Sequence, residues 1–172
     1  MRATFGHGDN PVAQTTTWLT PLYVVQALGV FDLDPCAYPG WPTARRAISL
    51  PEDGLEGRWR GRVWLNPPYG SEMYVWMSRL ADHGEGTALI FARTETVGFH
   101  KTVWDRADAV LFLQGRLKFH RPSGEAVNAA GAPSVLVAYG AKDAEALRQC
   151  NLPGAYINLR SNRVQMDLEE LL

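Results

Sequence analysis

The stretch at residues 63–70, Val-Trp-Leu-Asn-Pro-Pro-Tyr-Gly, constrains this chain more than any other. Its first three residues are apolar and suit a buried strand. Two consecutive prolines follow, and because proline has no backbone N–H to donate, the strand must end before them. Asn66 therefore lies just past the carboxyl end of a strand, with the aromatic Tyr69 close behind it. Ligands of open α/β sheets bind at that end of the strands, so the stretch predicts a ligand site.

Strand-like and helix-like patterns alternate along the rest of the chain. Strands are expected near residues 30–34, 63–65, 87–92, 109–113, 115–119 and 134–139. Helices are expected near residues 21–28, 72–82, 97–106, 143–150 and 164–172. This alternation predicts an α/β fold with one mostly parallel sheet and an antiparallel hairpin toward the C-terminus.

Composition favours one soluble, globular domain. The chain has 172 residues, of which 46% are hydrophobic and 20% are charged, which is enough for a real core. Residues 1–14 are expected to be flexible, and residues 15–172 to form a single domain without a separate target-recognition domain. No apolar run reaches membrane-spanning length, and the N-terminus lacks a signal-peptide pattern. Two cysteines give no disulfide framework, so a cytoplasmic location is expected.

Charge and histidine placement narrow the classes of ligand. The formal net charge is −1, so any contact with nucleic acid must depend on a local basic patch. The four histidines are scattered without the spacing of a metal site, and no metal is expected.

Five short blocks then occur in a recognisable order. They lie at residues 18–21, 31–37, 65–70, 92–96 and 115–119. Together they resemble the phage-type Dam family of DNA adenine-N6 methyltransferases, and five blocks in order are far more specific than one. The resemblance implies a compact Rossmann-like methyltransferase fold that uses S-adenosyl-L-methionine and acts on adenine in DNA. It also implies a phage or prophage origin, where base methylation can shield DNA from restriction.

The resemblance assigns roles to residues of the matching blocks. The catalytic motif is Asn66, Pro67, Pro68 and Tyr69. The cofactor-binding residues that it implies are Trp18, Thr20, Pro21, Asp34, Pro35, Cys36, Ala37, Asp53 and Asn66. The candidate DNA contacts are Arg93, Thr94, Arg116, Lys118 and Arg121, because they follow the catalytic strand and Arg93 ends a strand on the site's side of the sheet.

The chemistry of an exocyclic base amine explains why such residue types are needed. The amine is a poor nucleophile, because its lone pair is delocalised into the ring. Two acceptors that grip its two N–H bonds, the Asn66 side-chain oxygen and the Pro67 carbonyl, pull the nitrogen toward tetrahedral geometry and free the lone pair. An aromatic ring such as Tyr69 can stack on a base taken out of the duplex.

Other interpretations stay open on the sequence alone. The motif also suits methylation of DNA cytosine N4, RNA adenine or protein glutamine, or a non-catalytic module that binds nucleic acid. The Pro35–Cys36 pair resembles the nucleophile motif of cytosine-C5 methyltransferases, although their further motifs are not found here. Structural roles also compete, since Asp34 suits a loop cap, Asp53 a turn and Trp18 a core anchor.

Overall fold

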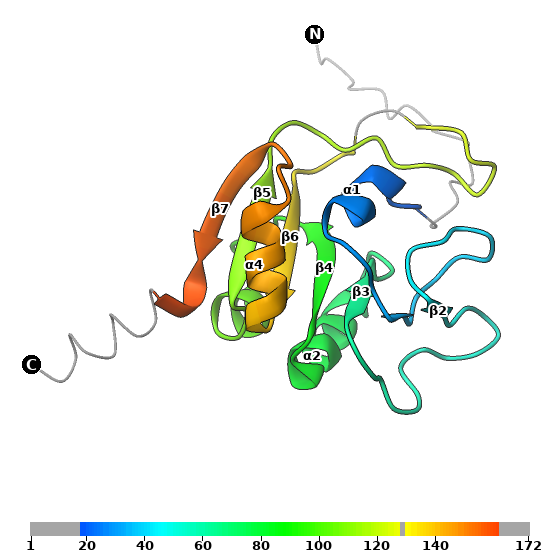
Figure 1. Ribbon diagram of the computed structural model, residues 1–172, viewed down its shortest axis with the longest axis horizontal. Coiled ribbons are helices and arrows are strands. Elements are labelled where there is room, and N and C mark those ends of the chain that lie inside the picture. Colours follow the sequence, from blue (N-terminus) through cyan, green and yellow to red (C-terminus); the bar gives the residue numbers. More distant parts are fainter. Residues whose placement is uncertain (1–17, 128–129, 162–172) are drawn as a thin grey trace, which may run out of the picture.

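A seven-stranded sheet forms the centre of the molecule (Figure 1). The computed structural model describes residues 18–127 and 130–161. The flexible stretch expected at residues 1–14 and the helix expected near 164–172 lie outside the described residues. The strands are β1 (Leu33–Asp34), β2 (Arg46–Ala47), β3 (Val63–Leu65), β4 (Gly86–Phe91), β5 (Ala109–Leu113), β6 (Ser134–Tyr139) and β7 (Gly154–Asn158).

The order of strands across the sheet is β2-β1-β3-β4-β6-β5-β7. The first four are parallel to one another, whereas β6 pairs antiparallel with both β4 and β5, and β7 pairs antiparallel with β5. The predicted α/β class and the antiparallel pairing toward the C-terminus are therefore confirmed. Because β1 and β3 are parallel neighbours, their carboxyl ends meet at the same edge of the sheet.

Helices cover both faces of the sheet. They are α1 (Leu22–Ala27), α2 (Met73–His83), α3 (Val97–Phe99), the π-helical segment η1 (His100–Trp104) and α4 (Ala141–Gln149). The apolar side chains of α2, α3 and η1 form one buried cluster with one face of the strands, and those of α1 and α4 form a second cluster with the other face. No helix in the described part of the chain is both long and apolar enough to cross a membrane.

Strand β3 shows why the sequence folds this way. Successive strand residues point to opposite faces, so Val63 and Leu65 pack into the cluster under α2, while Trp64 packs into the cluster under α1. All three are fully buried, which the continuous apolar run predicts for a central parallel strand. The tight burial holds the carboxyl end of β3 firmly, and the Asn-Pro-Pro-Tyr motif begins there.

Several expected boundaries hold and others do not. The helices expected near residues 72–82 and 97–106 are found as α2 and as α3 with η1, and the strands near 87–92, 109–113 and 134–139 are found within about one residue. The strand expected at residues 115–119 is wrong, because β6 and β7 already occupy both sides of β5. This segment instead bonds to its own return, with the Val127 amide donating to Phe119 and the Ala130 amide to Leu117. Strand β7 was not expected.

A buried ion pair joins the start of β3 to α4. Nε of Arg62, just before β3, donates to Oδ1 of Asp143 on α4 at 2.8 Å, and both side chains are almost fully buried. Arg62 also donates to the carbonyl of Leu28 at 2.7 Å, and Asp143 accepts from the hydroxyl of Thr87 at 2.7 Å. Burial raises the pKa of Asp143, against the lowering effect of Thr87 and Arg62.

Candidate active site

A cavity of about 770 Å³ opens at the carboxyl ends of β1 and β3. Asp34 ends β1, and Asn66 follows the last residue of β3, so parallel pairing brings the two side chains to one rim. The long irregular segment between β1 and β3 forms a second wall, and the N-terminal end of α2 adds Glu72. A cavity therefore lies at the carboxyl ends of the strands, where the sequence predicted a ligand site.

Asn66 holds a free acceptor in this cavity. Its Nδ2 donates to the backbone carbonyl of Trp18 at 2.7 Å, which fixes the plane of the amide. Its Oδ1 is buried and has no hydrogen-bond partner in the described structure. A buried carbonyl oxygen without a partner costs free energy, typically about 1–3 kcal/mol, so such an atom invites a ligand that carries a donor.

Tyr69 lies in an aromatic group beside Asn66. Its ring stacks on Phe91 at the end of β4, with centroids 4.2 Å apart and an interplanar angle of 13°. The Phe119 ring is nearly perpendicular to the Tyr69 ring, with centroids 6.5 Å apart. The Tyr69 hydroxyl is buried without a partner, and burial raises its pKa well above the usual range, so the phenol stays neutral. One face of the Tyr69 ring is therefore already occupied by Phe91.

Asp34 provides a buried carboxyl group at the other side of the cavity. Only 3% of its surface is exposed, and it accepts hydrogen bonds from the Cys36 amide at 2.9 Å and from the Thr43 hydroxyl. Burial outweighs these two bonds and raises the pKa of Asp34 from 3.8 to about 6. A carboxylate in this position favours a cationic ligand group, because a positive charge would offset the cost of its burial.

Cys36 is not poised as a nucleophile. Burial, together with the nearby charge of Asp34, raises the pKa of its thiol to about 12. The thiolate, not the thiol, is the reactive form, so the group is inert at neutral pH. The raised pKa of this thiol counts against the cytosine-C5 interpretation of the Pro35–Cys36 pair.

Asp53 lies exposed on the wall formed by the segment between β1 and β3. Its Oδ1 accepts from the Leu55 amide at 2.8 Å, which is an Asx turn. The turn role and a ligand role are compatible, because Oδ2 is left available at the rim of the cavity.

Trp41 closes part of the cavity, although no signal in the sequence marked it. Its indole N–H donates to the Thr20 carbonyl at 2.8 Å, and its ring lies 5.2 Å from that of His120. The Thr20 hydroxyl is buried without a partner. Thr43 was also missed, because its contact with Asp34 depends on a loop path that no local pattern describes.

The predicted site residues separate into two groups. Those that line the cavity are Trp18, Thr20, Asp34, Pro35, Cys36, Ala37, Asp53, Asn66, Pro67, Pro68 and Tyr69. Pro21 does not line it, because it precedes α1 and is turned into the fold.

The five candidate DNA contacts lie outside the cavity on two loops. Arg93 and Thr94 follow β4, and the others belong to the segment after β5. Arg116 and Lys118 are exposed, whereas Leu117 and Phe119 between and after them are buried, so the segment presents its basic side chains outward. Phe119 also contacts the ring of Trp18 at 6.5 Å, which places this segment beside the cavity. The described residues contain no group of His, Cys, Asp and Glu that could hold a metal ion.

The fold and this site define an α/β protein with a ligand cavity at the carboxyl ends of parallel strands, where an Asn-Pro-Pro-Tyr motif follows the central strand. A family model described as DNA N-6-adenine-methyltransferase (Dam) matches residues 8–160. The chain therefore belongs to the Dam family. Searches of curated proteins and of solved structures gave no match.

Proposed function

We propose that this protein transfers a methyl group from S-adenosyl-L-methionine to the N6 amine of an adenine flipped out of duplex DNA. The observation that carries the proposal is the free Oδ1 of Asn66, buried, unpartnered and oriented by the bond from Nδ2 to Trp18. Membership of the Dam family supports adenine in DNA as the substrate. The cavity at the carboxyl ends of β1 and β3 is where a Rossmann-like methyltransferase fold would hold its ligands.

The residues of the cavity fit the proposed methyl donor. The Asp34 carboxyl matches the ammonium group of its methionine part, and Trp18 and Thr20 also line the cavity. The free oxygen of Asp53 suits the amine of its adenine ring. When bound, this cofactor supplies an electrophilic methyl group on a sulfonium. Proline, tryptophan and tyrosine side chains around the cavity limit access of water to that group.

The chain's own residues prepare the amine. Asn66 Oδ1 and the Pro67 carbonyl each accept one N–H bond of the target N6, which leaves its lone pair pointing toward the methyl carbon. The bound cofactor would supply the methyl group to this lone pair and would keep the electron pair of the broken carbon–sulfur bond. Positive charge develops on nitrogen, where the two oxygen acceptors stabilise it. The nitrogen then loses one proton to solvent, because neither acceptor is a base.

The flipped base needs a stacking surface, and Tyr69 offers one. Phe91 covers one face of its ring, so adenine stacks on the opposite face. Unpairing costs a few kcal/mol, and stacking with polar contacts in the pocket recovers part of it. The Phe91 ring also keeps Tyr69 from rotating away, which makes the surface ready before DNA arrives.

The test uses Asn66→Ala, with Asn158→Ala as a control, because Asn158 is exposed on β7, far from the cavity. Digestion of treated DNA to nucleosides, followed by mass spectrometry, identifies the methylated base. We expect N6-methyladenine with the wild type and the control, and a loss of about 100- to 1000-fold in rate for Asn66→Ala. Asn66→Asp should keep some activity, since a carboxylate still accepts.

Two outcomes would contradict the proposal. A folded Asn66→Ala protein with more than about a tenth of the wild-type rate would remove Asn66 from the mechanism, given that expected loss. A wild type that methylates RNA adenine, cytosine N4 or a glutamine amide instead would change the substrate while leaving the chemistry of the motif intact.

A further inference from the structure

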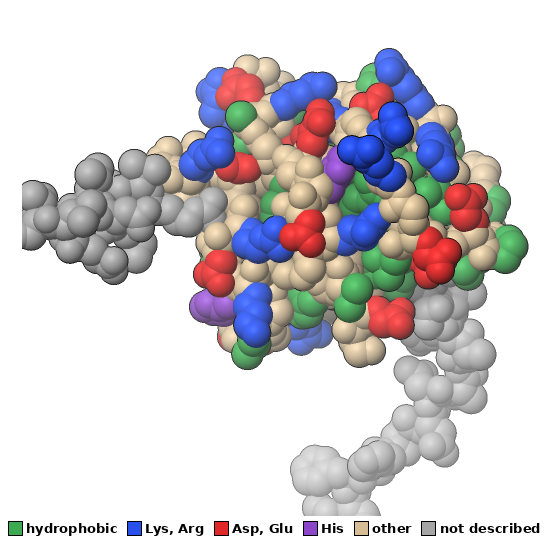
Figure 2. Space-filling view, turned by 90° about the horizontal axis from the view of Figure 1, so that it is seen from below, with side chains coloured by type: hydrophobic (Ala, Val, Ile, Leu, Met, Phe, Trp, Pro, Cys, Tyr) green, Lys and Arg blue, Asp and Glu red, His purple; other side chains and the backbone are tan. Residues whose placement is uncertain are grey.

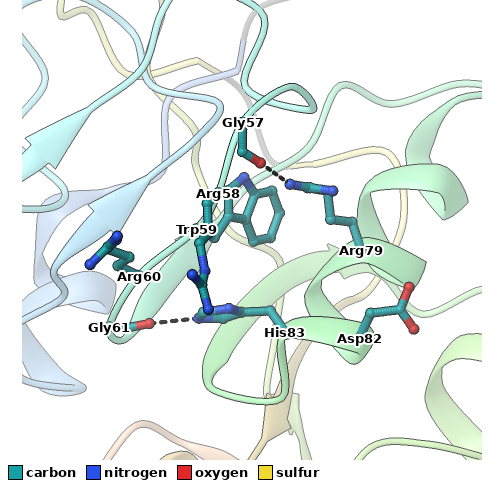
Figure 3. A pocket seen from close by; sticks show the side chains of 8 residues that line it. All are labelled: Gly57, Arg58, Trp59, Arg60, Gly61, Arg79, Asp82 and His83. Carbon is teal, nitrogen blue, oxygen red and sulfur yellow. Dashed lines mark hydrogen bonds between the residues drawn. The ribbon is translucent and has the colours of Figure 1, made fainter.

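A second hollow, of about 730 Å³, lies at the amino end of β3, whereas the Asn-Pro-Pro-Tyr motif follows the carboxyl end of that strand. Figure 3 shows the residues that line this hollow. It is formed by the loop that leads into β3 and by the last turns of α2. We call it the basic groove, and its lining residues are Gly57, Arg58, Trp59, Arg60, Gly61, Arg79, Asp82 and His83. Figure 2 looks onto this end of the molecule and shows several Lys and Arg side chains gathered there.

The floor of the basic groove is held in place by aromatic and polar contacts. Trp59 is 5% exposed, donates its indole N–H to the Gly54 carbonyl at 2.8 Å and stacks near Trp76 at 6.5 Å. The Arg79 guanidinium lies 5.1 Å over the Trp59 ring and donates to the Gly57 carbonyl. His83 bonds to the Gly61 carbonyl at 2.7 Å. Both loop-to-helix bonds are drawn in Figure 3.

The charges of the groove are unbalanced. Arg58 and Arg60 are exposed and form no ion pair with any described residue. Arg79 Nε is buried and has no hydrogen-bond partner among the described atoms. The single acid in the lining, Asp82, is paired with Arg106 at 2.6 Å and points away from Trp59 in Figure 3. The hollow is therefore lined by three arginines and by no carboxylate that is free of an ion pair, which favours an anionic ligand.

The form of the groove indicates phosphates rather than bases. Base stacking needs an open aromatic face, but the Trp59 ring is buried under Arg79. Guanidinium groups with free donors suit phosphate oxygens. We propose that the basic groove binds the phosphodiester backbone of DNA, as a sequence-independent anchor separate from the catalytic cavity. The proposal rests on DNA being the substrate, as proposed above.

The geometry sets the length of DNA required. Gly61 and Asn66 lie at the two ends of β3, five residues apart, which corresponds to roughly 17 Å of extended chain. A probe of about three helical turns, or roughly 30 base pairs, is several times longer than this separation, so its length does not limit contact with both surfaces.

The experiment measures the affinity of the full chain for a fluorescent duplex of that length over a series of salt concentrations. The test variant is Arg58→Ala/Arg60→Ala. The matched control is Arg148→Ala/Arg160→Ala, which also removes two exposed arginines, but near β7 at the far end of the sheet. We expect the test variant to bind about tenfold more weakly at 100 mM salt, with the slope of log K against log salt reduced by about 1.8 for two lost phosphate contacts. Arg58→Lys/Arg60→Lys should keep most of the affinity, because lysine also binds phosphate as a point charge.

The outcomes separate this inference from the proposed function. If the wild type binds the duplex and the test variant matches the control in affinity and slope, the groove does not bind the backbone. If the loss appears with one base sequence only, the groove is not a sequence-independent anchor. A wild type that binds no DNA would overturn both proposals. The readout is binding, so a failure of methyl transfer alone leaves this result unaffected.

Discussion

At the scale of single residues, Asp34 couples the proposed cofactor site to pH. Its pKa in the free protein is raised from 3.8 to about 6 by burial. An ammonium group of the ligand binds the carboxylate and not the neutral acid. Affinity for S-adenosyl-L-methionine should therefore be constant above about pH 7 and be roughly tenfold weaker at pH 5, where about a tenth of Asp34 is ionised. Calorimetric titration at several pH values measures this.

The Asp34→Asn variant serves as the control for that profile. It should bind the cofactor weakly and with no dependence on pH in this range.

Ionisation of Asp34 has the opposite effect on stability: it favours cofactor binding but destabilises the folded state. Because the folded-state pKa is raised, the stabilising contribution of Asp34 is present below about pH 3.8 and is lost as pH rises through about 6. Asp34→Asn should thus unfold at a higher urea concentration than the wild type at pH 7.5. An unchanged pH profile in this variant would exclude Asp34 from the cofactor site.

Tyr69 gives a second prediction at this scale. Its hydroxyl has no hydrogen-bond partner, so Tyr69→Phe should keep both fold and DNA affinity. Tyr69→Ala removes the ring that stacks on Phe91 and offers its other face to a base. Binding of a duplex with 2-aminopurine at the target position should weaken by about 1–3 kcal/mol. The fluorescence rise that reports an unstacked base should fall with it. Equal affinity of the Ala and Phe variants would place the base elsewhere.

At the scale of elements, the buried pair of Arg62 and Asp143 joins β3 to α4. Arg62→Ala leaves the Asp143 carboxyl buried without its cation and also frees the Leu28 carbonyl. We expect a loss of about 3–5 kcal/mol in the free energy of unfolding, measured by urea denaturation. The control is Arg148→Ala, whose partner Glu145 is exposed, and its midpoint should hardly move. Similar midpoints for both variants would mean that the ion pair contributes little to the free energy of unfolding.

The elements also show how far sequence patterns reach. Apolar runs and helical spacing predicted β3, α2, β4, β5 and β6, because each is bounded by strong breakers or has a clear period. The strand expected at residues 115–119 is wrong, although Leu117 and Phe119 are buried there and Arg116 and Lys118 are exposed. This alternation did not reveal that β5 has no free edge, since strand pairing is a property of the whole sheet. Strand β7 has a weak apolar pattern and is largely exposed, so it gave little signal.

The same limit applies to the candidate site. Asp34 at the end of β1 and Asn66 directly after β3 were predictable, because the carboxyl ends of parallel strands converge. Thr43, Trp41 and Phe91 were not, because their contacts depend on the path of loops between strands.

At the scale of the whole molecule, basic side chains occur at both ends of the parallel strands. Arg93 and the segment with Arg116 flank the cavity at the carboxyl ends of the strands, and the basic groove lies at the opposite end. With a formal net charge of −1, the protein has no overall attraction for DNA. We propose that affinity for DNA comes from these two local surfaces, and substitutions in each measure its contribution.

The last prediction concerns the surface beside the cavity. Arg93→Ala/Arg116→Ala should weaken binding of the same long duplex and reduce the salt slope by about 1.8, because two phosphate contacts are lost. Cofactor affinity should stay at the wild-type value, since neither arginine lines the cavity. Arg148→Ala/Arg160→Ala again controls for the loss of two positive charges. Normal duplex binding by the Arg93/Arg116 variant at moderate salt would place the DNA contacts elsewhere.

Combining this variant with Arg58→Ala/Arg60→Ala tests whether one duplex contacts both surfaces. Substitutions at well-separated sites without shared partners add within about 0.3–0.5 kcal/mol. If a single long duplex binds both surfaces, the losses in log K should therefore add, and the slope should fall by about 3.6 in total. Losses that do not add would show that a duplex binds one surface at a time.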